Sequence, residues 1–472
     1  MSELPNGWER AEIGDLCNLI NGRAFKPQEW SDSGLPIIRI QNLNNPASKF
    51  NHFSGDFDAK HHVKNGDLLF AWSGTPGTSF GAHIWHGGDA VLNQHIFKIE
   101  FSERETNRGF LRYAINQKLD ELISSAQGGV GLRHVTKGTF EKTEISFPPL
   151  AEQTRIAQKL DELLAQVDTL KARIDAIPAL LKRFRQSVLA AAVSGRLTEE
   201  WREEKPGDLG VVLNPKAKAL GMEELAAAEE LLTEPLPTFW KKYALEQLVE
   251  PDRGIPYGIV QTGSAVEKGI PTVRCGDVKN LFIDTSGLKI VSAEIEHEYK
   301  RTRLKGGEVL LAIRGSVGNV GVVPVSLRDC NISRELAMIP TLPSVVPFYL
   351  ACLLQSPLGQ RLLVGKVRGV AQKGINLADV RRLPVALPPY EEQTEIVRRV
   401  EQLFAFADQL EAKVASAKSR IDHLTQSVLA KAFRGELVPQ DPNDEPASVL
   451  LERIKTQRAA APKARRGRKA SA

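Results

Sequence analysis

Residues 147–153 read Phe-Pro-Pro-Leu-Ala-Glu-Gln, and residues 387–393, 240 positions later, read Leu-Pro-Pro-Tyr-Glu-Glu-Gln. The similarity continues downstream, where Gln186-Ser187-Val188-Leu189-Ala190 recurs unchanged at residues 426–430. Residues 148–197 and their counterparts share 19 identical residues of 50 without a gap. Unrelated stretches would share about three, so the chain contains an internal duplication.

The segments upstream of these stretches repeat more loosely. Pro36-Ile37-Ile38-Arg39 resembles Pro271-Thr272-Val273-Arg274, and residues 66–74 resemble residues 307–315. The interval between matching residues drifts from 232 to 241, so loops differ in length between the copies. Because loops on a fixed scaffold usually carry function, this pattern indicates one scaffold with two specificities.

Each duplicated stretch predicts one long helix. Apolar residues recur alternately every four and three positions, from Ile156 in the first copy and from Ile396 in the second. All eleven positions of the first seam are apolar, and ten of eleven in the second, where Lys431 is the exception. This pattern is typical of a coiled coil. The helices are predicted to begin after Pro-Pro and to end at Gly195 and Gly435, as rods roughly 60 Å long.

The order of globules and helices predicts how the helices pair. The first helix leads from the first globule to the second, and the second helix follows the second globule. We expect the two helices to pair with each other in an antiparallel coiled coil, with one globule at each end and a pseudo-two-fold axis between them. The alternative, in which each helix pairs with a partner protein, stays open.

The repeat defines seven segments along the 472 residues. They are a first globular domain at 1–148, a first coiled-coil helix at 149–196, a connecting region at 197–236, a second globular domain at 237–388, a second coiled-coil helix at 389–435, a C-terminal segment at 436–457 that we expect to pack near the first globule, and a disordered basic tail at 458–472.

Composition limits the class of protein without deciding its function. Apolar residues make up 42% and charged residues 25% of the chain, values that are typical of soluble globular proteins. The net charge is +5, but the last fifteen residues hold six basic and no acidic residues, so the body is nearly neutral. A near-neutral body can bind nucleic acid only through a local patch. The four cysteines are far apart without a CxxC pair, which indicates reduced thiols in a cytoplasm.

Both globules are predicted to be mixed α/β. Short strand-like runs, such as residues 35–40, 67–72 and 91–99, alternate with Gly, Pro, Asn and Asp, and each globule has one helix-like run, at 110–123 and 348–363. The longest uncharged run, residues 336–360, carries four prolines and is therefore no membrane span.

Polar side chains on loops that follow the predicted strands are candidate DNA-binding residues. Arg and Lys can bind guanine bidentately, Asn and Gln can bind adenine, and Ser and Thr are general donors. In the first globule the candidates are Arg39, Trp72, Ser73, Thr75, Thr78, Ser79, Gln94, His95, Arg133 and His134. In the second globule they are Arg274, Arg314, Ser316, Asn319, Arg334, Gln372 and Lys373.

No catalytic motif is complete in this sequence. Leu387-Pro388-Pro389-Tyr390 approaches the Asn/Asp-Pro-Pro-aromatic loop of adenine methyltransferases but lacks the polar first residue. A P-loop and the GxSxG and HExxH motifs are absent. Seven of the nine histidines lie in the first globule, but without HxH or HxxxH spacing. We therefore expect no active site, no cofactor and no metal in this chain.

The duplication, the paired Pro-Pro-x-x-Glu-Gln starts and several local runs resemble the specificity subunits of type I restriction–modification enzymes. The runs are Trp72-Ser73-Gly74-Thr75-Pro76-Gly77, Leu92-Asn93-Gln94-His95-Ile96-Phe97 and Leu429-Ala430-Lys431-Ala432-Phe433-Arg434-Gly435-Glu436-Leu437. The resemblance covers residues 5 to about 457. The order and duplication of these runs make it specific.

The resemblance implies a division of labour. Each globule would be a target recognition domain that reads one half of a bipartite, asymmetric site in double-stranded DNA, and the helices would fix the spacer between the halves. Two methyltransferase subunits would dock on the helices, bind S-adenosylmethionine and flip out adenines for methylation. Two restriction subunits would supply an ATP- and Mg-dependent motor and nuclease.

Two other interpretations belong to different functional classes. One is a single-chain DNA adenine methyltransferase with a degenerate motif, which would bind S-adenosylmethionine unaided. The other is a coiled-coil adaptor whose globules bind proteins, which would show no preference for any DNA half-site.

Overall fold

The computed structural model describes residues 4–45, 47–74, 80–125, 133–205, 210–232, 235–367 and 374–460. The chain forms two compact units, one of Met1–Ile174 with Ala417–Ala472 and the other of Asp175–Ser416. Each unit contains one globule and parts of both long helices.

The first globule is a mixed α/β domain, as predicted. Its strands form two four-stranded sheets, in the orders β2-β10-β6-β8 and β4-β3-β9-β5, and two strand pairs, β1-β12 and β11-β7. The elements are β1 (Glu9–Glu12), α1 (Ile13–Leu16), β2 (Cys17–Asn21), β3 (Leu35–Ile38), α2 (Ile40–Asn44), β4 (Asn51–Phe53), β5 (His62–Val63), β6 (Leu68–Ala71), β7 (Ser73–Gly74), β8 (Gly81–Ile84), β9 (Ala90–Leu92), β10 (Ile96–Phe101), α3 (Arg108–Gln117), α4 (Leu119–Ser124), β11 (Arg133–His134), α5 (Lys137–Glu141) and β12 (Glu144–Phe147).

The second globule is built on the same plan with smaller sheets. Its strands are ordered β15-β14-β18 and β17-β16-β19, with β13-β20 as a separate pair. The elements are β13 (Lys241–Ala244), β14 (Ile270–Val273), the 3₁₀ turn η5 (Cys275–Asp277), β15 (Lys289–Val291), α9 (Ala293–His297), the 3₁₀ turn η6 (Lys300–Thr302), β16 (Val309–Ala312), β17 (Val320–Val322), β18 (Asn331–Ile332), β19 (Leu336–Ile339), α10 (Pro347–Gln355), α11 (Pro357–Val364), α12 (Leu377–Arg381) and β20 (Pro384–Leu387).

The strand register shows that the two globules are structural repeats. β3 runs parallel to β9 with Ile37 opposite Val91, and β14 runs parallel to β18 with Thr272 opposite Asn331. The antiparallel pair β6–β10 likewise corresponds to β16–β19. The predicted internal repeat is therefore confirmed at the level of backbone pairing.

Three predicted elements are interrupted in the structure. The strand expected at 91–99 is two strands, β9 and β10, because residues 93–95 form a turn between them. The helix expected at 110–123 breaks at Lys118, between α3 and α4. The helix expected at 348–363 breaks before Pro357, where the Ser356 hydroxyl accepts a hydrogen bond from the Gly359 N–H at 3.1 Å and caps α11.

The two long helices begin and end where the sequence predicts. α6 spans Leu150–Ser194 and α13 spans Tyr390–Phe433. Gly195 (φ 82°) and Gly435 (φ 74°) follow them in the left-handed conformation that commonly ends a helix. The connecting region contributes the short helices α7 (Glu199–Glu204) and α8 (Met222–Glu230).

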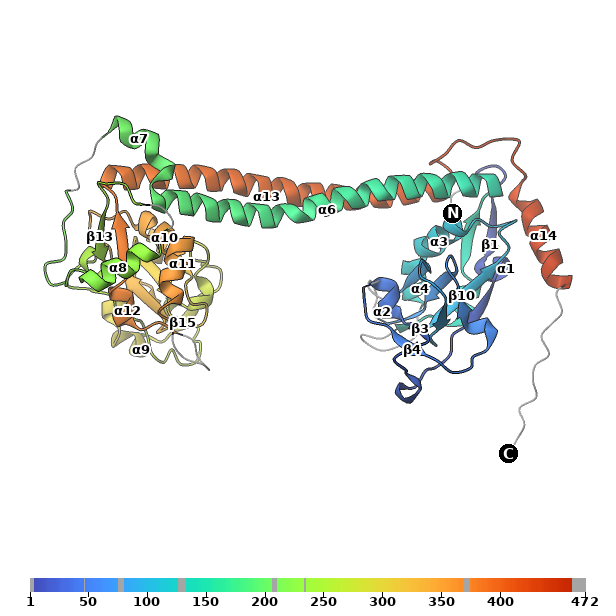
Figure 1. Cartoon of the computed structure of the whole chain (residues 1–472), viewed down its shortest axis with the longest axis horizontal. Coiled ribbons are helices and arrows are strands. Elements are labelled where there is room, and N and C mark those ends of the chain that lie inside the picture. Colours follow the sequence, from blue (N-terminus) through green and yellow to red (C-terminus); the bar gives the residue numbers. More distant parts are fainter. Residues whose placement is uncertain are drawn as a thin grey trace. The chain divides into compact units, whose positions relative to one another are not determined.

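α6 and α13 pair in an antiparallel arrangement (Figure 1). In the first unit, Ile156 and Leu160 near the start of α6 share a core with Ala432 at the end of α13, and Lys171 lies 2.7 Å from Asp422. In the second unit, the end of α6 shares a core with Ile396 and Val400 at the start of α13. Pairing of the helices within the chain is thus the arrangement observed.

In each copy, hydrogen bonds to the Glu-Gln pair at the start of the long helix connect that helix to its globule. The indole N–H of Trp8 donates to Glu152 at 2.9 Å, and that of Trp240 donates to Glu392 at 2.9 Å. Both carboxylates are 1% exposed. The neighbouring glutamines also accept hydrogen bonds from backbone N–H groups of their globules, in residues Asn107 and Val346.

The C-terminal segment packs on the first globule, as predicted. Helix α14 (Ala447–Ala460) places Leu450 and Ile454 in the same core as Ile13. The tail predicted from residue 458 is wrong for residues 458–460, which belong to this helix. There the Arg458 guanidinium donates to Asn18 at 2.7 Å, and this contact keeps the last turn on the globule.

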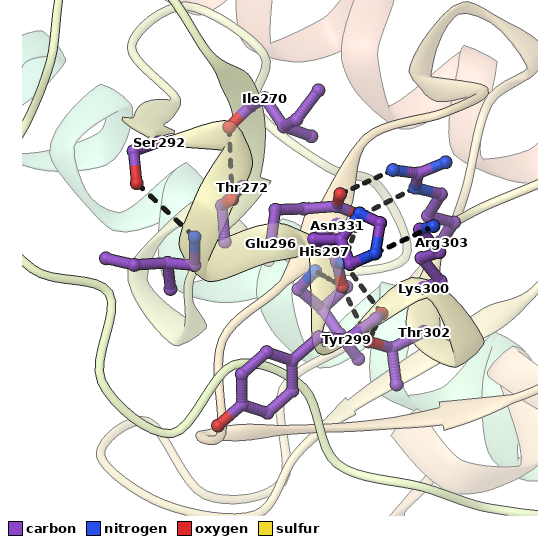
Figure 2. A network of polar contacts seen from close by, with 12 residues as sticks. Ile270, Thr272, Ser292, Glu296, His297, Tyr299, Lys300, Thr302, Arg303 and Asn331 are labelled. Atoms are coloured by element: carbon purple, nitrogen blue, oxygen red, sulfur yellow. Dashed lines mark hydrogen bonds and ion pairs between the residues drawn. The ribbon is translucent and has the colours of Figure 1, made fainter.

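The interior of the second globule holds a buried polar network (Figure 2). Asn331 on β18 donates to Glu296 at 2.9 Å and accepts from the Thr302 hydroxyl at 2.7 Å. Glu296 is bound bidentately by Arg303, at 2.6 and 2.5 Å. Glu296 and Asn331 are both fully buried. The network fixes β18, which leads directly into the loop that carries the candidate Arg334.

Candidate nucleic-acid interface

Four candidate segments of the first globule meet near the ends of β3, β6 and β9. The backbone N–H of Trp72, after β6, donates to the carbonyl of His95 at 3.3 Å. The Trp72 carbonyl accepts from the N–H of Val135 at 3.0 Å, next to His134. The β9 segment runs beside β3, which ends just before Arg39. Residues from four distant parts of the sequence thus form one surface.

Trp72 and Ser73 position the histidines of this surface. The Trp72 ring stacks on Phe97 with a centroid distance of 5.5 Å and lies 5.5 and 5.8 Å from the rings of His95 and His134. The Ser73 hydroxyl is 2.9 Å from Nδ1 of His134. Ser73 is buried and His134 is exposed, so this contact holds the exposed imidazole against the globule.

Arg39, Gln94 and His95 line a common hollow of about 240 Å³. The side chains of Gln94 and His95 are in contact at 3.0 Å. Burial lowers the pKa of His95, and the nearby His134 and Arg39 lower it further. The free protein therefore holds His95 mainly neutral near pH 7, with Nε2 engaged by Gln94 and Nδ1 buried without a partner among the described residues.

Two aromatic residues in this hollow were not among the predicted residues. Phe25 and Trp30 line it from the segment after β2. That segment crosses the candidate loop at Gly22, where a Cβ would lie 2.0 Å from the Asn93 carbonyl oxygen. Gly258 makes the same crossing in the second globule, 1.9 Å from the Ile332 oxygen. The pairing of these glycines across the repeat is the sequence signal that could have located the segment.

Equivalent segments converge in the second globule. The N–H of Arg314 donates to the Glu335 carbonyl at 3.3 Å, and the N–H of Ser333 donates to the Val273 carbonyl, next to Arg274, at 2.8 Å. The N–H of Arg334 donates to the Ile259 carbonyl at 2.9 Å. The same backbone framework thus presents a second candidate surface.

The predicted side chains of the second globule have different surroundings. Arg314, Ser316 and Arg334 are exposed, and neither arginine forms an ion pair with another described residue. The Asn319 amide donates to the Val278 carbonyl at 3.1 Å, so it is engaged within the globule. The Arg274 guanidinium is bound by Asp277.

Part of the predicted set lies outside the described residues. This applies to Thr75, Thr78, Ser79, Gln372, Lys373 and the side chain of Arg133, whose backbone pairs with Gly74. In the part of the chain that is described, no group of three His, Cys, Asp or Glu side chains could hold a metal ion. Within the same residues, no helix combines the length and apolar character needed to span a membrane.

A family model described as the type I restriction modification DNA specificity domain matches the chain twice, at residues 5–179 and 240–417. The two matches coincide with the two copies of the repeat. The chain belongs to the type I restriction enzyme specificity subunits. The family resemblance drawn from the duplicated motifs is therefore confirmed.

Relatives in this family cover nearly the whole chain. The EcoBI specificity subunit of Escherichia coli is 38% identical over 468 residues, covering 97% of this chain and 94% of the relative. The EcoKI specificity subunit of Escherichia coli (strain K12) is 33% identical over 497 residues and covers 99% of each chain.

Solved structures of the family share the fold. The HsdS subunit from Thermoanaerobacter tengcongensis matches with a TM-score of 0.55 and 20% identity, over 92% of this chain and 99% of that one. A chain from a structure of a type I R-M system, studied for complex assembly and conformational transition, matches with a TM-score of 0.63 and 20% identity, over 93% and 100%.

Proposed function

We propose that this chain is the DNA-reading subunit of a type I restriction–modification complex and that each globule reads one half of a bipartite, asymmetric site. One observation carries the proposal. Equivalent loops follow equivalent strands in the two globules, but their side chains differ. Gln94 corresponds to Arg334, and His95 corresponds to Glu335. Arginine, glutamine and glutamate favour different base edges, so two such surfaces would read different sequences.

We further propose that two methyltransferase subunits dock on the long helices and that two restriction subunits complete the complex. Large apolar side chains outside the predicted seams are left exposed on these helices, including Leu180 (56%) and Phe406 (55%). Such side chains favour contact with other proteins. We assign S-adenosylmethionine, ATP and Mg to the partner subunits and expect this chain to be non-catalytic, because its sequence contains no complete catalytic motif.

The experiment that tests the function maps adenine methylation across the genome of the host cell, with and without this gene. We expect one two-part motif, methylated once on each strand, to disappear when the gene is deleted and to return when it is restored. A gene carrying Arg314→Ala should alter only one half of that motif. Persistence of every motif in a host with an active methyltransferase partner would contradict the proposal.

The long helices make a separate prediction about the spacer of the DNA site. Four residues added to each helix beside the facing pair Lys171 and Asp422 would lengthen both by one turn, about 6 Å. With one base pair per about 3.4 Å, we expect the spacer to lengthen by one or two base pairs. Both half-sites should stay the same, and methylation mapping of the variant reads spacer and half-sites together. An unchanged spacer in an active variant would contradict the role of the helices as a ruler.

A further inference from the structure

Arg39 and Arg274 occupy equivalent positions in the two globules. Each follows a buried strand, β3 or β14, and each immediately precedes a short helical turn, α2 or η5. In both copies the side chain three residues later accepts a hydrogen bond from the arginine's own N–H. The acceptor is Asn42 at 3.1 Å in the first globule and Asp277 at 2.8 Å in the second. The backbone is thus capped alike, by an amide in one copy and by a carboxylate in the other.

The carboxylate of Asp277 also binds the side chain of Arg274. Nε and Nη2 of the guanidinium each lie 3.2 Å from one of its oxygens, and Nη2 donates to the Gly287 carbonyl at 3.3 Å. Asp277 is largely buried, with 14% of its side chain exposed, and it raises the pKa of Arg274. A guanidinium whose Nε and Nη2 are both engaged in this way has fewer donors left for another ligand.

Arg39 has no such partner among the residues that the structure describes. The Asn42 amide carries no charge, and its NH₂ group faces the carbonyls of Ser48 and Lys49, at 3.3 and 3.4 Å. Among the described residues Arg39 forms no ion pair. Its guanidinium lies 5.8 Å from the ring centroid of Trp30 and lines the hollow that also holds Gln94 and His95. An aromatic face orients a guanidinium without consuming its charge or its hydrogen-bond donors.

We infer that the residue three positions after this arginine determines whether the guanidinium can bind DNA. Asn42 leaves the guanidinium of Arg39 available, whereas Asp277 binds the guanidinium of Arg274 and makes it unavailable to DNA. This inference rests on the proposed function and names two specificity-determining positions within it. The ligand of Arg39 is a pair of DNA acceptor atoms, either on the edge of a guanine or on a phosphate. Asp277 also places a negative charge beside the arginine, which repels phosphates.

The test exchanges the two capping residues in the full chain, assembled with its methyltransferase partner. Asn and Asp have nearly the same shape and both cap, so Asp277→Asn should keep the fold. Asn42→Asp also loses the amide hydrogen bonds to Ser48 and Lys49 and should lower stability, so its binding is compared with that of Arg39→Ala after thermal unfolding has shown that it is folded. Binding is measured on duplexes that carry the two-part motif identified by methylation mapping, and on duplexes with one half-site scrambled.

We expect Asn42→Asp to weaken DNA binding about tenfold or more, as Arg39→Ala does, because either change removes the bidentate contact of the arginine with DNA. Combining the two substitutions should weaken binding no further than Arg39→Ala alone. Asp277→Asn should strengthen binding several-fold, and Arg274→Ala added to it should remove the gain. Loss confined to one base pair would identify a base contact of Arg39, whereas equal loss on all sequences with a shallower salt dependence would identify a phosphate contact.

Three outcomes would overturn the inference: an Arg39→Ala variant that binds like the parent, an Asn42→Asp variant that retains binding while Arg39→Ala loses it, or no gain from Asp277→Asn that depends on Arg274. Failure of the proposed function would look different, because the unmodified complex itself would then show no preference for any two-part DNA site.

Discussion

The parallel strand pairs β3–β9 and β14–β18 have the same register but opposite interiors. In the first globule Ile37 faces Val91, and both pack with Phe53 in an apolar cluster. In the second globule Thr272 faces Asn331, which belongs to the buried network with Glu296. The backbone pairing is therefore the constant element of this repeat. The interior can change from apolar to hydrogen-bonded provided that every polar group finds a partner.

The starts of the long helices show the same divergence on a smaller scale. Both Glu152 and Glu392 accept an indole N–H through one oxygen. The second oxygen of Glu392 accepts from the Thr198 hydroxyl at 2.8 Å and from Arg202 at 3.0 Å. The second oxygen of Glu152 is buried and has no partner among the described residues. One copy thus holds a paired carboxylate and the other an underpaired one.

The largest effect should come from making β18 resemble β9. Asn331→Val places in the second globule the residue that β9 has at the matching position. It removes a donor to Glu296 and an acceptor for the Thr302 hydroxyl and for the N–H of Ile332, all of them buried. Each unsatisfied buried group costs about 1–3 kcal/mol, so we expect the free energy of unfolding to fall by about 3 kcal/mol. Calorimetry with the two units fitted as separate transitions measures it.

A conservative core change in the first globule is the matched control for Asn331→Val. Ile37→Val removes one buried methyl group from the apolar cluster and should cost only about 1 kcal/mol. A cost for Asn331→Val no larger than that of Ile37→Val would show that the polar network adds nothing beyond packing. The comparison of the two interiors would then lose its energetic meaning.

The second prediction concerns the paired carboxylate at the start of α13. Glu392→Gln keeps the shape and the hydrogen bond from Trp240 but removes the charge that Arg202 contacts. Hydrogen bonds to charged groups contribute about 1.5–3 kcal/mol when buried, so we expect a loss of about 2 kcal/mol in the second unit. Glu152→Gln is the matched control in the first unit and should change stability by less than about 1 kcal/mol. Equal losses in both units would contradict the assigned difference between the two anchors.

Much of the fold could be predicted from the sequence because it rests on long periodic patterns. The helices α6 and α13, their limits at Pro-Pro and at Gly195 and Gly435, and their antiparallel pairing all followed from the seam and the chain order. The breaks at residues 93–95 and before Pro357 were missed, because a short apolar run does not show where a turn interrupts it. Residues 458–460 were taken for tail because they begin the basic stretch 458–472, whereas Arg458 is held by Asn18, far away in the sequence.

The candidate site could be predicted only as a set of loops. The repeat indicated which loops correspond, and the structure brings them together in each globule. Composition could not distinguish Arg39 from Arg274, since their difference depends on which side chain reaches the guanidinium. Trp30 was missed for a similar reason, because only the crossing at Gly22 brings its segment beside residues 93–95.

The smallest predicted effect is a pH dependence at the start of α6. Burial raises the pKa of Glu152 above its ordinary value of 4.5, although the Trp8 hydrogen bond and Arg155 oppose this shift. A carboxyl whose pKa is raised by folding favours the folded state fully below its unfolded pKa and loses that contribution as the pH rises through the folded pKa. Glutamine at the same position cannot ionise. The stability of Glu152→Gln relative to the parent should therefore be lowest below pH 4.5 and should rise with pH to a plateau, by about 1 kcal/mol or less.

The difference between the two unfolding free energies cancels the titration of all other groups, so calorimetry at matched pH values isolates this carboxyl. A relative stability of Glu152→Gln that falls as pH rises would mean that Arg155 and Trp8 outweigh burial, and Glu152 would then be as well paired as Glu392.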